Sequence, residues 1–173
     1  MPAATLRSAA CPATQREAGG ARSVNEDFLD LLRLLLRADT KFLVVGAHAM
    51  AVHGVPRATG DIDIWVDPDP ANADRAWRAL LEFGAPVREV GVSRKDLETP
   101  GVVIQIGRPP RRIDILTQIS GVSFEEAWRN RTIHSFETLP IPFLGRAELV
   151  RNKRASGRPK DLADLDVLDK GTA

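Results

Sequence analysis

The fold is decided by one stretch, Thr59-Gly60-Asp61-Ile62-Asp63-Ile64-Trp65-Val66, in which acidic and apolar residues alternate. Successive side chains on a β-strand point to opposite faces, so the isoleucines and Val66 can enter a core while both aspartates face the other way. At a rise of roughly 3.3 Å per residue, the two carboxylates would emerge about 7 Å apart. Two anions held this close are costly unless a cation or a basic group neutralises them, and Mg²⁺ is the candidate because it prefers oxygen ligands.

A second stretch, Arg111-Arg112-Ile113-Asp114-Ile115-Leu116, repeats this pattern with one aspartate between two isoleucines. If the two strands are neighbours, Asp114 joins Asp61 and Asp63 on one polar face. Three converging carboxylates are the ligand set of a two-metal phosphoryl-transfer site. The alternative is that exposed strands often carry aspartate and that an Asp-Ile-Asp pair arises by chance.

The residues before the acidic strand predict a phosphate-binding turn. The segment from Val45 through Gly46 and Ala47 to Gly54 reads as a strand end, a tight turn and a short helix that closes at a glycine. A helix N-terminus presents backbone N–H groups and a positive dipole end, which suit a phosphate. Thirteen residues separate the Gly-Ala pair from Asp-Ile-Asp, and the combination is more specific than either motif alone.

With this spacing the chain resembles the polymerase-β-like nucleotidyltransferase superfamily, whose signature is a hydrophobic strand, Gly-Gly or Gly-Ser, a short spacer and Asp-x-Asp. The longer match from Val45 to Asp63, together with the tail 151–164, is similar to a small bacterial branch related to the AbiEii-type toxin nucleotidyltransferases. The resemblance covers roughly residues 40–169. Ala47 stands where the superfamily has Gly or Ser, so it keeps the backbone donor but supplies no hydroxyl.

The resemblance implies an α/β (α+β) fold, a mixed β-sheet with flanking helices and a short helical C-terminal extension. We therefore expect three parts: a disordered leader (1–22), a nucleotidyltransferase-like domain (23–145) and a helical extension packed on the same domain (146–169). The implied reaction is Mg²⁺-dependent, or Mn²⁺-dependent, transfer of a nucleoside monophosphate from a nucleoside triphosphate to a hydroxyl on RNA, a protein or a small molecule. Some relatives imply a cognate toxin or antitoxin partner.

The implied site residues fall into two groups. The metal ligands and catalytic residues are Asp61, Asp63 and Asp114. The nucleotide-binding residues are Gly46, Ala47, Arg57, Thr59, Lys153 and Lys160.

The C-terminal region carries a basic run with two interpretations. From residue 146 to residue 160 there are six basic residues and one acidic residue. Such a run is usually a solvated helix face, but its arginines could also contact RNA or another polyanion. Asp161 has two interpretations as well. We favour a carboxylate that complements the helix dipole in the first turn over one paired with a buried Arg or Lys.

Three function classes follow: an active transferase, a non-catalytic partner-binding or antitoxin module on the same scaffold, and an RNA-binding protein that uses the basic run. Composition does not distinguish these classes, because the formal net charge of the 173 residues is only +1 and gives no overall attraction to nucleic acid. No apolar run reaches membrane-spanning length, and residues 1–22 lack a signal-peptide core, so we expect a cytoplasmic protein without membrane contact. The chain has no tyrosine, so a tyrosine acceptor must belong to a partner.

Local signals predict the remaining elements. A capping box of Ser23 and Glu26 precedes a helix at 28–37, and a helix is expected at 71–83. Residues 102–106 and 112–116 should form an antiparallel pair, and Ser123 should begin a short helix. Residues 132–144 give one or two strands that Pro140 and Pro142 confine to sheet edges. Helices at 146–155 and 159–169 end the chain. The histidines and tryptophans are interpreted as structural.

Overall fold

The computed structural model describes residues 5–9 and 24–170, and within them seven strands form one mixed sheet flanked by helices. The strands lie in the order β1-β4-β5-β3-β2-β7-β6. Their bounds are β1 Thr5–Ala9, β2 Phe42–Val45, β3 Asp61–Val66, β4 Val102–Ile106, β5 Arg112–Leu116, β6 Thr132–Phe136 and β7 Leu139–Phe143. The helices are α1 Val24–Arg37, α2 Gly46–Val52, α3 Pro70–Phe83, α4 Arg94–Glu98, α5 Phe124–Arg129, α6 Arg146–Ser156 and α7 Pro159–Lys170. This arrangement confirms the predicted α/β class.

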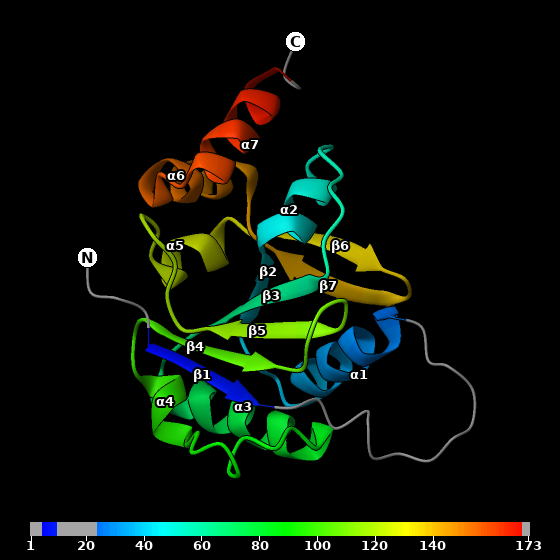
Figure 1. Cartoon of the computed structure of the whole chain (residues 1–173), viewed down its shortest axis with the longest axis vertical. Helices are drawn as coiled ribbons and strands as arrows, with labels where there is room; N and C mark the ends of the chain where they lie inside the picture. Colours follow the sequence, from blue (N-terminus) through cyan, green and yellow to red (C-terminus); the bar gives the residue numbers. More distant parts are fainter. Residues whose placement is uncertain (1–4, 10–23, 171–173) are drawn as a thin grey trace.

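The helices divide between the two faces of the sheet. Helices α1, α3 and α4 cover one face, and α2, α5, α6 and α7 lie on the other (Figure 1). The face under α1, α3 and α4 holds Ile62, Ile64 and Val66 of β3. Four apolar residues of α1 pack there, each at most 2% exposed: Phe28, Leu31, Leu32 and Leu35. The aspartates of β3 are therefore left on the side of α2, α6 and α7. Among the described residues, no helix is long and apolar enough to cross a membrane.

Strand pairing fixes the register of the acidic residues. Strands β3 and β5 run parallel and place Asp63 opposite Asp114, with Asp61 opposite Arg112. Strand β4 pairs antiparallel with β5, which confirms the predicted hairpin, and it places Gln105 opposite Asp114. The central strands thus bring both acidic stretches into direct contact.

Helix ends explain where the elements around this sheet begin and end. Asp69 caps α3 by accepting hydrogen bonds from the backbone N–H groups of Ala71 and Asn72, and Gly84 closes the helix at φ +81°. Ser123 accepts from the backbone N–H of Glu126 at the start of α5, as the sequence predicted. Ser23 of the first predicted capping box lies outside the described residues.

Three elements differ from the sequence prediction. Within the leader expected to be disordered, Thr5–Ala9 forms β1, a parallel edge strand on β4; the rest of the leader, with Cys11, lies outside the described residues. Helix α4 was missed, although Ser93 and Asp96 form a capping box there. Strand β7 is not an edge, because it lies between β2 and β6. It accommodates its prolines because it pairs with β2 only at its last residue, beyond Pro142.

Three of the aromatic and histidine side chains, Trp65, His48 and His53, are packed within the fold. Trp65 is 1% exposed and meets the ring of Phe124 edge to face. His53 Nε2 lies 2.8 Å from the carbonyl oxygen of Leu144, which ties the end of α2 to the residue that follows β7. Burial lowers the pKa of His48, which favours its neutral form in that position.

Candidate active site

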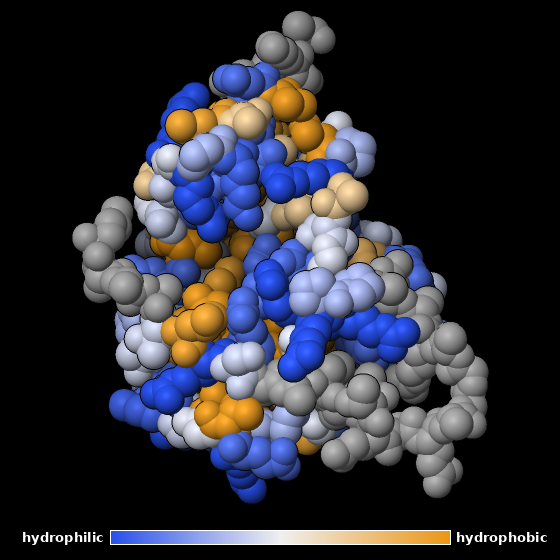
Figure 2. Space-filling view, in the orientation of Figure 1, coloured by the Kyte–Doolittle hydropathy of each residue, from blue (hydrophilic) through white to orange (hydrophobic). Residues whose placement is uncertain are grey.

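All nine residues predicted for catalysis or nucleotide binding line one cleft. The cleft has a volume of about 970 Å³ and lies between the polar face of the sheet and helices α6 and α7. Hydrophobic and hydrophilic residues are mixed along the hollow below α6 (Figure 2). The predicted residues in its lining are Gly46, Ala47, Arg57, Thr59, Asp61, Asp63, Asp114, Lys153 and Lys160.

The first turn of α2 packs directly beneath one carboxylate. Gly46 has φ +64°, a conformation that L side chains rarely adopt. A Cβ atom at this position would lie 2.1 Å from Oδ2 of Asp63. Glycine is therefore required at position 46 for two reasons: the backbone angle is positive, and the Asp63 carboxylate occupies the space that a side chain would fill.

The environment of Asp63 disfavours its charged form. Burial raises its pKa, and the negative charges of Asp114 and Asp61 raise it further, to about 6. The positive charges of Lys160 and Arg112 act in the opposite direction without cancelling the rise. A carboxyl group that titrates near neutrality in a cleft is typical of functional sites.

The other two carboxylates are linked through one arginine that the sequence interpretation missed. The Arg112 guanidinium donates through Nη2 to Oδ2 of Asp61, and its Nε lies 3.0 Å from Oδ1 of Asp114. Asp61 also accepts a hydrogen bond of 2.5 Å from the hydroxyl of Thr59. The period of two along β5 puts Arg112 on the same face as Asp114, so the signal was present in the sequence.

The contact between Arg112 and Asp114 is close but poorly aligned. Neither Arg112 Nε nor Asp114 Oδ1 has a hydrogen-bond partner, although both atoms are buried. The Asp114 side chain is 9% exposed, and burial raises its pKa, while the positive charge of Arg112 lowers it and the negative charge of Asp61 raises it. The pair is thus a charge contact that leaves one carboxylate oxygen without a well-aligned donor.

These contacts bear on the predicted metal site. Within residues 5–9 and 24–170, no group of three acidic, histidine or cysteine side chains is already arranged to hold a metal ion. The three aspartates nevertheless supply the oxygen ligands that Mg²⁺ prefers, and Oδ1 of Asp114 is a buried acceptor without a donor. The residues therefore fit an ion, on condition that the Arg112 side chain gives way.

Lys153 is held by the protein itself. Its side chain is 6% exposed, and its Nζ lies 3.2 Å from Oδ1 of Asp161 and 2.6 Å from Oδ2 of Asp164. Asp161 lies in the first turn of α7, as expected, but it is 3% exposed and pairs with this buried lysine, so the alternative interpretation of a buried ion pair is confirmed. Its neighbour Leu162 is 49% exposed.

The same acidic residues of α7 connect three segments around the cleft. Asp164 accepts two hydrogen bonds from Nη1 of Arg57, at 3.0 and 2.9 Å, and thereby joins the loop before β3 to α6 and α7. Burial alone would raise the pKa of Asp161, but hydrogen bonds from Ser156, Arg158 and Lys153 hold it at about 2. This ion-pair network stabilises the wall of the cleft opposite the aspartates.

Comparison with solved structures shows a likeness to a known protein. No protein-family model matches the chain, and no curated protein does. A crystal structure from Thermotoga maritima of a protein named a "putative nucleotidyltransferase" is similar, with 18% sequence identity and a TM-score of 0.48. The match covers 86% of this chain and 94% of that chain. The function proposed below is argued from the cleft itself.

Proposed function

We propose that this cleft is the active site of a Mg²⁺- or Mn²⁺-dependent nucleotidyltransferase, which moves a nucleoside monophosphate from a nucleoside triphosphate to a hydroxyl acceptor. The observation that carries the proposal is the direct pairing of Asp63 with Asp114 across β3 and β5, with Asp61 two residues away on the same face. The facing wall supplies cationic groups from Arg57 and Lys160. Acidic and basic walls on one cleft suit a metal-bound triphosphate.

The three aspartates would hold the ion. Carboxylate oxygens match its ligand preference, and Asp114 offers a buried oxygen without a hydrogen-bond donor. When bound, the ion neutralises charge on the triphosphate and makes the acceptor hydroxyl more acidic.

The protein positions the reactants and takes up the proton. The acceptor oxygen forms a bond to the α-phosphorus while the bond from that phosphorus to the bridging oxygen breaks, and pyrophosphate leaves with the electron pair. Asp114 accepts the proton of the acceptor hydroxyl. Burial raises the pKa of Asp114, which makes this carboxylate a stronger base. The backbone N–H groups at Gly46 and Ala47, with Arg57 and Lys160, hold the terminal phosphates.

Labelling tests the proposal. The protein is incubated with each α-labelled nucleoside triphosphate, Mg²⁺, and total tRNA or cell extract. The wild type should label an acceptor, and Asp63→Asn should lower the rate by about a hundredfold or more because a group acting at the transition state is lost. Asp74→Asn is the matched control, since Asp74 lies on α3 on the other face of the sheet and pairs with Arg78 at the surface. Labelling that survives Asp63→Asn contradicts the site assignment.

The acceptor class and a toxin–antitoxin role are part of the same proposal. Comparing tRNA with extract separates RNA acceptors from protein and small-molecule acceptors. Self-labelling on tyrosine is excluded because the chain has none. Rescue of growth by a co-expressed neighbouring gene, in cells where the wild type but not Asp63→Asn is harmful, supports a toxin–antitoxin pair.

A second candidate is a non-catalytic module that binds a partner or acts as an antitoxin. It is favoured by one observation: Arg112 already neutralises two of the three aspartates within the protein. Ala47, which lacks a hydroxyl, points the same way. Partner binding retained by Asp63→Asn, with no labelling by either form, would select this candidate.

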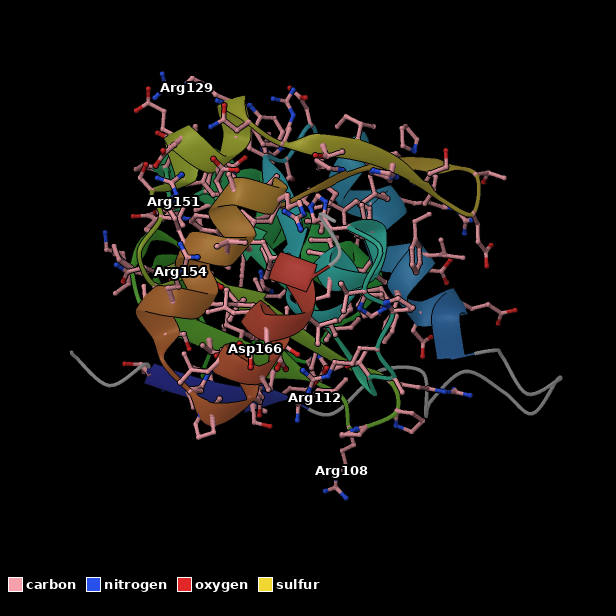
Figure 3. The ribbon with its side chains drawn as sticks, turned by 90° about the horizontal axis from the view of Figure 1, so that it is seen from above. Arg108, Arg112, Arg129, Arg151, Arg154 and Asp166 are labelled. Carbon is pink, nitrogen blue, oxygen red and sulfur yellow. The ribbon has the colours of Figure 1, made fainter. Side chains whose placement is uncertain are left out.

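An RNA-binding role for the basic run has less support from the geometry. Lys153 is buried between two aspartates, and Arg151 pairs with Glu126 and Glu148. The side chains of Arg129, Arg151 and Arg154 lie along one side of the molecule, on α5 and α6 (Figure 3). Salt-sensitive RNA binding that is lost on neutralising Arg154 would support this role.

A further inference from the structure

Arg112 stands where the proposed reaction needs a cation. It belongs to β5, two residues before Asp114 on the same face, and lies opposite Asp61 in the parallel pairing. Its guanidinium contacts both carboxylates, and its side chain is only 28% exposed. One positive group therefore spans two of the three acids.

The quality of the two contacts is unequal. The guanidinium donates a hydrogen bond to Asp61, but towards Asp114 the nitrogen and oxygen are 3.0 Å apart without hydrogen-bond alignment. A guanidinium is planar and presents its donors in a fixed fork, so it cannot satisfy two carboxylates from neighbouring strands equally well. A small spherical cation has no such directional limit.

We propose that Arg112 is the resident counter-cation of the acidic cluster and that a divalent ion binds by displacing it from Asp61 and Asp114. The inference rests on the proposed function. Arg112 keeps Asp61 and Asp114 together when no ion is bound, and it raises the concentration of divalent ion needed to occupy the cleft. It is a positioning residue, because it acts through the aspartates and not on the substrate.

The displacement follows from charge. An unpaired cluster of three carboxylates on two adjacent strands would be costly in a partly buried cleft. Arg112 offsets this cost, but it also repels any second cation at short range. Removing the guanidinium should therefore lower the stability of the ion-free protein and raise its affinity for the ion. A purely structural arginine would not produce these two opposite effects.

Mn²⁺ affinity tests the inference, measured by electron paramagnetic resonance of the free ion in a titration without nucleotide. Arg112→Gln should bind Mn²⁺ about tenfold or more tightly than the wild type. Arg112→Lys keeps the charge and should stay close to the wild type. The matched control is Arg108→Gln, which removes the same charge from the same hairpin at an exposed side chain that points away from the molecule (Figure 3).

Several results would overturn the inference: equal or weaker binding by Arg112→Gln, binding by Arg112→Lys as tight as that of Arg112→Gln, or equal tightening in Arg108→Gln. If Arg112→Gln fails to fold, displacement of Arg112 can be tested in the wild-type protein. The ¹⁵N resonance of Arg112 Nε should move when Mg²⁺ binds, and an unmoved resonance at saturation refutes displacement. Labelling by the wild type is measured separately, so the inference can fail while the proposed function stands.

Discussion

Replacing Asp63 with asparagine should make the protein more stable above about pH 6 and should change its stability little below about pH 4. The cause is the raised pKa of this carboxyl group, about 6 in the folded protein against an ordinary value of 3.8. Burial is the largest contribution, followed by the charges of Asp114 and Asp61. Asparagine has nearly the same shape and carries no charge to bury.

The sign and the size follow from proton linkage. Because its pKa is raised on folding, Asp63 binds more protons in the folded than in the unfolded chain between these two values, so the free energy of unfolding falls as the pH rises. The contribution is fully present below the unfolded pKa and is lost as the pH rises through about 6. A difference of about two pKa units corresponds to about 3 kcal/mol, as an upper limit for a coupled cluster.

Urea denaturation from pH 4 to pH 8 measures the effect. The difference in unfolding free energy between Asp63→Asn and the wild type should grow by up to about 3 kcal/mol across this range. Asp74→Asn is the control, because the Asp74 side chain is 46% exposed beside Arg78, and its difference should stay nearly constant. A difference for Asp63→Asn that is flat with pH, or that becomes destabilising at pH 8, would refute the assigned burial and charge environment.

Two further predictions concern the turn and the ion-pair network. Gly46→Ala should cost more stability than Gly54→Ala, although both glycines have positive φ, because only at Gly46 does a Cβ meet Asp63, whereas nothing lies within 4 Å at Gly54. The strained backbone angle alone should cost about 1–2 kcal/mol at each position. Equal losses of unfolding free energy in urea denaturation, with equal labelling activity, would show that Asp63 does not pack against Gly46. Lys153→Met should cost about 2–4 kcal/mol, since it leaves Asp161 buried without its lysine, and a loss below about 1 kcal/mol would contradict the buried pair.

The position of the acidic residues could be predicted because it depends on local alternation. In β3 and β5 the period of two separates aspartates from isoleucines, and burial of the isoleucines fixes which face the aspartates take. The only non-local information needed was that the two strands are neighbours. Since each strand has a single polar face, their pairing brings Asp63 and Asp114 together without further specification.

Contacts between side chains from distant segments were harder to predict. The sequence places Asp161 in the first turn of α7, where the structure has it, but it does not show the lysine of α6 that packs against this carboxylate. Strand β1 was missed because Thr5–Ala9 is short, its residues 5–8 are exposed, and it pairs with β4 alone. In each case the deciding contact joins segments whose proximity depends on how the whole chain packs.

Charge balance inside the cleft has a consequence for how a nucleotide would enter. The acidic cluster is paired with Arg112, and on the opposite wall Arg57 is paired with Asp164. A metal ion and an anionic triphosphate arriving together would compete with both pairs, the ion for the aspartates and the phosphates for Arg57. Neither ligand alone replaces both sets of contacts. Under the proposed function, metal and nucleotide should therefore each bind more tightly when the other is present, because each releases charges that the other can use.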